Sequence, residues 1–311
     1  MVVSARTERV PDPVTALPDV LVLGVGGTLG EAWLRGLLSG LESASGLDFR
    51  DCEYFVGSSA GSIVASSLAA GRRPQAGDRA ARAWGEAAPE AGAAPGLLGR
   101  AARGAGRLGV AAAGPFAPLA LAGAAPAGRA VRAAALRTGP STGRSLGGLR
   151  RHLEALGARF DGRLRISAVD RANGRRVMFG APAAPAAEVS EAVLASCAVP
   201  WVFAPVRIGG REYVDGGVWS PTNLDAAPAG RGSSILCLVP TALAGGIAPL
   251  RAFSLAAVAT ETLAVRSRGA TVRTLVPDAA SAAVMGANLM DPRRSEDVLD
   301  AAFAQGRALA G

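Results

Sequence analysis

The sequence predicts an α/β protein whose central β-sheet is mixed and mainly parallel. An apolar run at residues 20–23, and a strand expected at 51–56 that ends in the apolar Tyr54-Phe55-Val56, each pass through a glycine-rich turn into a helical pattern. Units of this kind connect neighbouring parallel strands through a crossover helix. Further short strands and helices follow, and one pair of strands is joined by a tight Asn-Gly turn, so part of the sheet is expected to be antiparallel.

The first unit combines a buried strand with a glycine loop. Residues 20–23 are apolar, G-V-G-G-T-L-G follows at 24–30, and leucines recur behind the loop at helical spacing. Such a loop presents backbone N–H groups at a helix N-terminus, which forms an anion site for a phosphate or a transient oxyanion. The spacing departs from the G-x-G-x-x-G of dinucleotide sites, and a P-loop is excluded because the chain contains no lysine.

The second unit contains G-S-S-A-G at residues 57–61, the pattern of a nucleophile elbow with Ser59 at its apex. Gly57 and Gly61 allow strand and helix to approach closely. The following helix, expected at 62–70, directs free N–H groups and a positive dipole end at the serine oxygen. The pentapeptide alone is a weak signal in a glycine-rich chain, and its strand–turn–helix context makes Ser59 a candidate nucleophile.

The rest of the chain completes the sheet and its helices. Strands are expected at 164–170, 177–179, 212–215, 234–239 and 271–276, and helices at 149–156, 189–196, 255–265 and 296–309. Asp215 ends one of these strands and is followed by Gly216 and Gly217. An Asp-Gly-Gly sequence is either a surface turn or a place where a carboxylate approaches another group closely.

The composition favours a folded protein with anionic partners. Half of the residues are apolar, and the formal charge of +8 comes from arginine alone. Such a surface suits phospholipid headgroups or nucleic acid. Residues 74–148 form an apparent insertion rich in alanine, glycine and arginine. Its uncharged run at 108–128 is long enough to span a bilayer, but its prolines and glycines favour a mobile helical cap or an interfacial segment.

Several residues carry no clear catalytic signal. Residues 1–19 lack the apolar core of a signal peptide, which predicts a flexible lead-in and a cytoplasmic protein.

Cys52, Cys197 and Cys237 are odd in number and lie beside apolar residues, which indicates buried thiols rather than disulfides. His152, the only histidine, falls beside two arginines on a helix and is interpreted as a surface residue.

Three motifs in this order resemble those of the patatin-like phospholipase family. They are G-G-T-L-G at 26–30, G-S-S-A-G at 57–61 and D-G-G at 215–217, and the stretch at 195–205 is similar to the one that precedes the aspartate in that family. The likeness extends over about Leu21 to Asp225, with a similar tail near 291–308.

This resemblance implies the three-layer fold of the family, with a mixed, mainly parallel sheet and a helical insertion. It places the acyl-hydrolase domain at residues 20–228 and its cap at about 74–148. Residues 229–311 would then supply the strand and helices that complete the fold.

The resemblance also implies a Ser59–Asp215 dyad that hydrolyses esters without a histidine. A catalytic triad needs a histidine, and the only one here lies on an arginine-rich helix with nothing to mark it as catalytic. The residues themselves therefore also favour a dyad over a triad. The remaining site residues that the resemblance implies are the oxyanion donors Gly26, Gly27 and Ala60 and the motif glycines Gly24, Gly30, Gly57, Gly61, Gly216 and Gly217. No cofactor and no metal ligands are expected.

The chain departs from the family at one position of the glycine loop. Leu29 stands where the family commonly has arginine or lysine, and Arg35 is a candidate substitute. Trp201 and Trp219 flank Asp215 in the sequence, where they either line an acyl groove or pack in the core.

Three functions compete at this point. The first is a serine acyl hydrolase that acts on a phospholipid or another lipid ester, with peripheral contact to an anionic membrane. The second is a catalytically weak or inactive protein of the same fold that binds a lipid or a partner. The third is nucleic-acid binding, which the acid-free stretch from Arg100 to Arg151 suggests, but only Phe116 could stack on bases there, so no nucleic acid is expected. The oligomeric state is left open.

Overall fold

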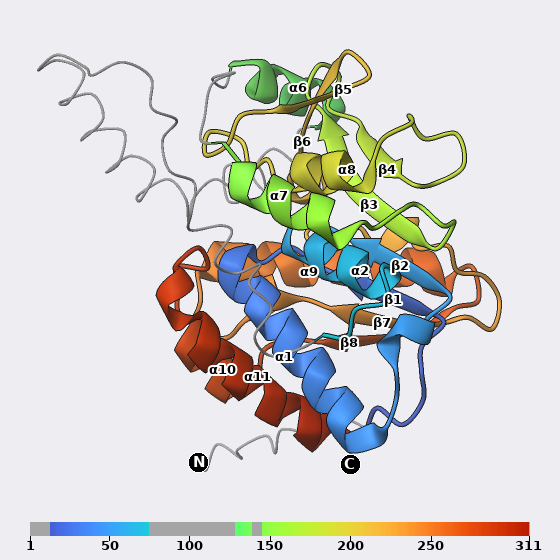
Figure 1. The fold of residues 1–311 in the computed structure, drawn as a ribbon, viewed down its shortest axis with the longest axis vertical. Coiled ribbons are helices and arrows are strands. Elements are labelled where there is room, and N and C mark those ends of the chain that lie inside the picture. The colour runs from blue at the N-terminus through green and yellow to red at the C-terminus, as the bar shows by residue number, and fades with distance from the viewer. Residues whose placement is uncertain (1–12, 75–127, 139–144, 311) are drawn as a thin grey trace, which may run out of the picture.

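The mixed sheet and its helices are present in the computed structural model, which describes residues 13–74, 128–138 and 145–310 (Figure 1). The strands are β1 (Val20–Leu23), β2 (Tyr54–Gly57), β3 (Leu164–Asp170), β4 (Arg176–Phe179), β5 (Val206–Ile208), β6 (Arg211–Asp215), β7 (Ser234–Leu238) and β8 (Thr271–Leu275). The helices are α1 (Gly27–Ser45), α2 (Ala60–Ala69), α6 (Gly128–Thr138), α7 (Gly147–Leu156), α8 (Val189–Ser196), α9 (Ala248–Arg266), α10 (Ala279–Met285) and α11 (Ser295–Leu309).

The strands form one sheet in the order β5-β6-β3-β2-β1-β7-β8, with β4 also paired to β3. The pairs β1–β2, β1–β7, β2–β3 and β7–β8 are parallel, and the pairs that involve β4, β5 and β6 are antiparallel. Leu23 of β1 lies beside Gly57 of β2 in the register. The glycine loop and the elbow therefore leave the sheet at the same edge, because both follow parallel strands that end together.

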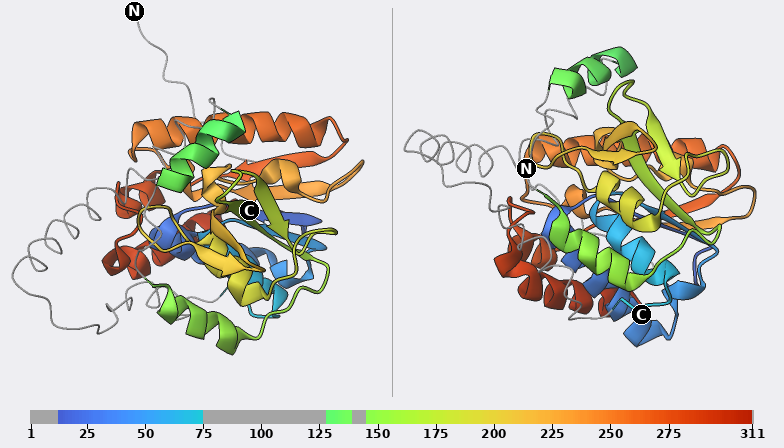
Figure 2. Two further views of the ribbon diagram at one scale, coloured as in Figure 1. Left: turned by 90° about the horizontal axis from the view of Figure 1, so that it is seen from above. Right: turned by 45° about the horizontal axis from the view of Figure 1, so that its top comes forward.

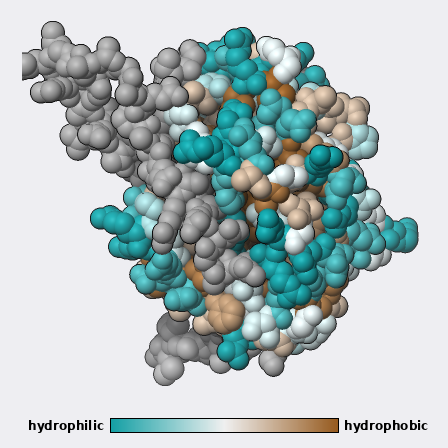
Figure 3. Space-filling model, in the orientation of Figure 1, coloured by the Kyte–Doolittle hydropathy of each residue, from teal (hydrophilic) through white to brown (hydrophobic). Residues whose placement is uncertain are grey.

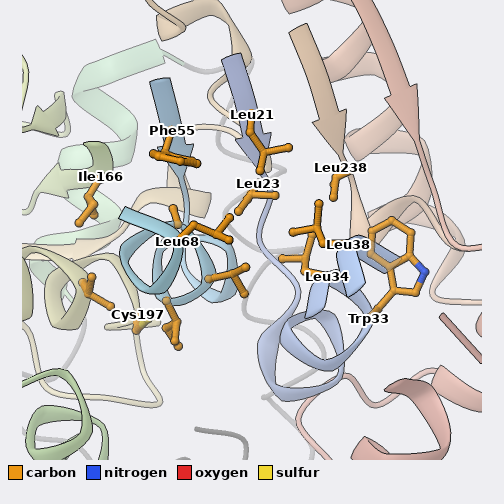
Figure 4. Packing of buried hydrophobic residues seen from close by; sticks show 14 of the residues in the cluster. Leu21, Leu23, Trp33, Leu34, Leu38, Phe55, Leu68, Ile166, Cys197 and Leu238 are labelled. Atoms are coloured by element: carbon orange, nitrogen blue, oxygen red, sulfur yellow. The ribbon is translucent and has the colours of Figure 1, made fainter. Parts of the chain in front are cut away.

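The sheet is buried on both faces, which gives the expected three layers. Successive residues of β1 point to opposite sides. Leu21 and Leu23 lie between the sheet and the helices α1 and α2 (Figure 4), while Val20 and Val22 share a cluster with Val258 of α9. Figure 2 (left) shows α6 and α9 on one side of the sheet, and α2, α7 and α8 on the other. On the face drawn in Figure 3, hydrophilic residues cover most of the described surface.

The local patterns place most elements correctly. The strand at 164–170 and the helix at 189–196 have the predicted bounds, and β3 and β4 form the antiparallel pair expected across the Asn-Gly turn. The second strand starts later than predicted, because residues 49–51 form a 3-10 turn whose cap is the Asp48 side chain. α9 starts earlier than predicted, with Pro249 in its first turn, where the missing N–H of proline costs nothing.

The flexible lead-in predicted for residues 1–19 is wrong for residues 13–19. The N–H of Val14 donates to the Leu309 carbonyl at 2.7 Å, and Asp19 Oδ2 accepts hydrogen bonds from the backbone N–H and the hydroxyl of Ser234. Val14 is also buried against the core. Prolines and charges suggested a loose segment, but these contacts are with residues more than 200 positions away. Residues 1–12 lie outside the described part of the chain.

Most of the predicted insertion at 74–148 also lies outside the described residues, including nearly all of the uncharged run at 108–128. Its described portions are residue 74, helix α6 and residues 145–148. The proposed cap is therefore neither supported nor contradicted, and the division into domains stays a prediction.

Helices α1 and α11 pack backbone against backbone through glycines. A Cβ atom at Gly40 would lie 2.2 Å from the Phe303 carbonyl oxygen, and one at Gly306 would lie 2.3 Å from the Leu37 carbonyl oxygen. Both distances are far below van der Waals contact, so this packing requires glycine at these positions. The contact attaches the C-terminal helix to the helix that follows the glycine loop.

We predict that Gly40→Ala lowers the free energy of unfolding by about 1–3 kcal/mol, although alanine is the better helix former. The reason is that the two helices must separate to admit the methyl group. Urea unfolding would measure the change, with Gly230→Ala as the control because a Cβ at Gly230 meets only open space. The control should stay within about 0.5 kcal/mol of the unsubstituted protein. Equal stabilities for the two variants would contradict this account of the packing.

Candidate active site

Ser59 lies at a strained turn between β2 and α2. Its backbone has φ +50° and ψ −120°, a conformation that residues other than glycine rarely adopt and that costs about 1–3 kcal/mol. Two hydrogen bonds hold the turn in place. The Ser59 N–H donates to Ser196 Oγ at 2.8 Å, and Ser62 Oγ donates to the Ser59 carbonyl at 2.6 Å. This is the geometry of a nucleophile elbow.

The two glycines of the elbow are required by close contacts. A Cβ atom at Gly61 would lie 2.0 Å from the Leu23 carbonyl oxygen, and one at Gly57 would lie 2.5 Å from the Ser62 Cα atom. The Ser58 N–H also donates to the Leu23 carbonyl at 3.0 Å. Helix α2 therefore starts directly against the end of β1, and Ser59 lies beside the glycine loop.

Asp215, at the end of β6, is brought into contact with Ser59. The residue is only 5% exposed, Oδ1 accepts the Gly217 N–H at 2.7 Å, and the Ser59 side chain lies close enough to the carboxyl group to act on its pKa. Burial raises the pKa of Asp215 to about 7, although the Gly217 N–H and the nearby Ser59 side chain act to lower it. The carboxyl group therefore exchanges its proton near neutral pH.

The glycine loop forms a third wall of the site. A Cβ atom at Gly217 would lie 3.0 Å from Val25 Cγ1, so the turn after Asp215 packs on this loop. Pro240 closes the loop from the other side, because a Cβ at Gly26 would lie 2.8 Å from Pro240 Cβ. Among the described residues, nothing accepts a hydrogen bond from the N–H groups of Gly26 and Gly27, or from that of Ala60 at the start of α2.

A buried polar network that sequence reasoning missed supports both turns. Ser58 Oγ lies 2.7 Å from Ser167 Oγ, and the Asn223 side-chain amide donates to the Ser58 hydroxyl at 3.0 Å. The same amide is 2.9 Å from the Ser220 carbonyl. A Cβ at Gly216 would lie 2.0 Å from Ser167 Oγ, so the turn after Asp215 rests directly on this network. The sequence offered only a weak signal for this network, namely Ser58 beside Ser59 and Asn223 eight residues after Asp215.

Cys197 is a neutral neighbour of Ser62 and Asp215. All three cysteines are buried free thiols, as predicted. Cys197 Sγ lies 3.9 Å from Ser62 Oγ, and burial raises the pKa of this thiol well above its ordinary value. Figure 4 shows Cys197 in the apolar layer below the sheet. The thiol therefore adds no charge beside Asp215.

The other sequence candidates lie elsewhere. His152 is half-buried on α7 rather than freely exposed, and its Nε2 atom has no hydrogen-bond partner among the described residues. Leu29 is fully buried in the core, and its N–H donates to the Leu289 carbonyl at 2.9 Å. Arg35, the candidate substitute for the missing cation, is buried and pairs with Glu31 on the same helix at 3.0 Å.

Trp201 and Trp219 pack beside Val214 on the opposite face of β6 from Asp215. The guanidinium groups of Arg132 and Arg176 lie 4.6 Å and 5.2 Å from the ring centre of Trp219. Of the two alternatives that the sequence left open for these tryptophans, an acyl groove or packing, the contacts favour packing. In the described part of the chain, no group of three His, Cys, Asp or Glu side chains could hold a metal ion.

Comparison with protein families matches residues 21–228 to the family described as patatin-like phospholipase. Among solved structures, the crystal structure of the type III effector protein ExoU is similar, with 20% sequence identity and a TM-score of 0.41. The match covers 96% of this chain and 53% of the ExoU chain, so the chain spans about half of the length of that protein. Comparison with curated proteins gives no match.

We predict that Asp215→Asn stabilises the protein progressively as the pH rises. The pKa of Asp215 is about 7 in the folded protein against an ordinary 3.8, so the carboxyl group stabilises the fold at low pH and loses this contribution as the pH passes through 7. The uncharged amide does not ionise. Relative to the unsubstituted protein, the variant should gain up to about 4 kcal/mol in unfolding free energy between about pH 4 and pH 8.

Urea unfolding at several pH values would measure this difference. The matched control is Asp300→Asn on the exposed side of α11, because an exposed carboxyl group meets water in both the folded and unfolded states. The control should show a difference that does not change with pH. A pH-independent difference for Asp215→Asn as well would contradict the burial of a titrating carboxyl group at this position.

Proposed function

The chain belongs to the patatin-like phospholipase family, and on that premise we propose that it is a serine acyl hydrolase that cleaves carboxylic esters of lipids. In this proposal Ser59 is the nucleophile and Asp215 is the general base. The observation that carries it is the proximity of the Ser59 side chain to a buried carboxyl group whose pKa is raised to about 7. The family supports a lipid substrate broadly, and the assignment of the two residues rests on their contact.

The proposed reaction begins with attack of Ser59 Oγ on the ester carbonyl carbon. As the new C–O bond forms, the hydroxyl proton passes to Asp215, and the carbonyl becomes a tetrahedral oxyanion. Collapse of this intermediate breaks the ester C–O bond, and the leaving alcohol takes the proton back from Asp215. Water then attacks the acyl-serine by the same proton route, which releases the fatty acid and restores the Ser59 hydroxyl.

A raised pKa makes an aspartate an effective base here. An ordinary carboxylate is too weakly basic to activate a serine, but the pKa of about 7 at Asp215 narrows the gap to the hydroxyl. The same burial excludes water that would compete for the carboxylate. The strained backbone at Ser59 breaks the chain direction between β2 and α2, and the residue is only 3% exposed, so a substrate carbonyl would have to displace what covers it.

The oxyanion would be met by backbone donors. The N–H groups of Gly26, Gly27 and Ala60 lie at the starts of α1 and α2, where the dipole ends are positive, and are not used by other described residues. One such donor contributes about 3 kcal/mol in other hydrolases. Because these donors are main-chain groups, the buried Leu29 does not remove them.

One observation favours a second candidate function. The glycine loop has a buried leucine at the position where the family commonly has a cation, and Arg35 is already paired with Glu31. A catalytically weak or inactive protein of the same fold that binds a lipid or a partner would tolerate that change. A fluorophosphonate probe separates the two, because it labels only an activated serine.

We predict that Ser59→Ala and Asp215→Asn each lower the hydrolysis of a water-soluble p-nitrophenyl ester by at least about 1,000-fold. His152→Gln should stay within about twofold of the unsubstituted protein, since its side chain takes no part in the proposed chemistry. Fluorophosphonate labelling, followed by mass spectrometry, should identify Ser59. Loss of activity in a folded His152→Gln variant would overturn the dyad, and an unlabelled folded protein would favour the binding function.

We predict that kcat/KM rises with pH through an apparent pKa of about 7, since the base must be deprotonated before it can accept the serine proton. Below this value the rate should fall about tenfold per pH unit. The measurement is the pH profile of ester hydrolysis, with the folded state checked at each pH by circular dichroism. A flat profile from about pH 5 to pH 9 would exclude Asp215 as the titrating base.

A further inference from the structure

Helix α9 has an outer face that is apolar except for Thr260. The exposed apolar residues of this face, called here the α9 outer face, are Ala252, Leu255, Ala256, Ala259, Leu263 and Ala264. Leu255 is 40% exposed and Leu263 is 69% exposed, and they are the large hydrophobic side chains that the described part of the chain leaves exposed. Two exposed leucines on one helix face are unusual for a surface that only meets water.

The inner face of α9 carries two buried polar residues. Ser254 is fully buried, and its hydroxyl lies 2.8 Å from that of Thr241. Glu261, the only acidic residue of α9, is also buried, and its Oε2 atom accepts hydrogen bonds from the Thr222 hydroxyl and the Leu224 N–H. Buried polar residues thus stand among the apolar inner residues Leu250, Val258 and Val265, while leucines are exposed on the other side, which departs from the usual pattern of a surface helix.

These inner contacts attach α9 to two walls of the candidate active site. Thr241 follows Pro240, which closes the glycine loop at Gly26. Thr222 and Leu224 belong to the segment that follows Asp215. The helix is thus fixed to both sides of the site, and a surface bound to its outer face would be held in a constant position relative to the dyad.

The charges at the ends of α9 decide what the outer face can bind. Arg251 lies near one end and Arg266 and Arg268 near the other, and all three are exposed. The two ends are about 22 Å apart along the helix axis. Since no acidic side chain of α9 is exposed, a second copy packed antiparallel on this face would bring arginine against arginine. A negatively charged surface complements both ends.

The helix does not have to cross the bilayer to meet lipid. In the part of the chain that the structure describes, α9 is the helix long and apolar enough to span a membrane. However, Val258 and Val265 on its inner face pack in the cluster that covers β1 and β7. Crossing would strip this cover from the sheet. If α9 lies in the plane of the membrane interface, its leucines are buried among the acyl chains and its arginines reach the headgroups.

We propose that the α9 outer face docks on the surface of an anionic bilayer, with Leu255 and Leu263 inserted among the acyl chains and Arg251 and Arg266 on lipid phosphates. The inference rests on the proposed function, because it assumes that the substrate is a lipid presented at a bilayer. It adds the surface by which the protein reaches that substrate.

The test is co-sedimentation of the full chain with phosphatidylcholine vesicles, with and without phosphatidylglycerol. Leu255→Gln/Leu263→Gln should weaken binding to anionic vesicles by at least about tenfold, since both apolar anchors are lost. Arg251→Gln/Arg266→Gln should weaken it by about tenfold on anionic vesicles only. Arg72→Gln/Arg175→Gln is the matched control, because it removes the same charge from exposed positions on other elements.

Failure of the unsubstituted protein to bind anionic vesicles, or equal loss in the control pair and the Arg251/Arg266 pair, would overturn the proposal. Light scattering in solution completes the test. A dimer that the leucine substitutions dissociate would show that the face binds a second copy, which also overturns it. Hydrolysis of the water-soluble ester, measured in parallel, keeps the two proposals apart. Active protein that ignores vesicles contradicts only the docking surface, and vesicle binding without hydrolysis contradicts only the enzymatic function.

Discussion

The structure depends most on the contact between the Ser59 side chain and the carboxyl group of Asp215, which burial keeps away from water. A carboxyl group in water would be fully ionised at neutral pH and weakly basic, whereas burial raises the pKa of Asp215 to about 7. Close backbone packing at Gly57 and Gly61, where a Cβ atom would force strand and helix apart, and the packing of Gly217 on Val25 bring the surrounding turns together. By allowing the turns to lie close together, these glycines help to bury the carboxyl group of Asp215 and so raise its pKa.

The strain and burial at the site are compensated by hydrogen bonds from neighbouring elements. Ser196 at the end of α8 accepts the Ser59 N–H, and Asn223 bonds to the hydroxyl of Ser58. A buried polar group without a partner costs about 1–3 kcal/mol, so each of these residues stabilises a turn that would otherwise relax. The site is consequently held by side chains from the elbow, from α8 and from the segment after Asp215, and not by the elbow alone.

Helix α9 connects this site to the outside of the molecule. Its buried Ser254 and Glu261 bond to segments beside the glycine loop and after Asp215, while Leu255 and Leu263 face outward. Buried polar residues inside and exposed leucines outside are each costly for a helix that meets only water. The same distribution is favourable where the outer side meets lipid, which relates the unusual helix to a protein of a lipid-acting family.

The sequence by itself determined the strand–turn–helix units, the elbow at Ser59 and the aspartate turn at Asp215, because each depends on residues that are neighbours in the chain. The resemblance of three motifs in order then indicated that serine and aspartate belong together. Only the tertiary structure decided that Asp215 is buried enough to titrate near neutral pH, that Asn223 supports the elbow, and that residues 13–19 pack on the fold. It also decided which side of α9 faces outward. These properties arise from contacts between residues far apart in the sequence, and local patterns of residue type do not specify such contacts.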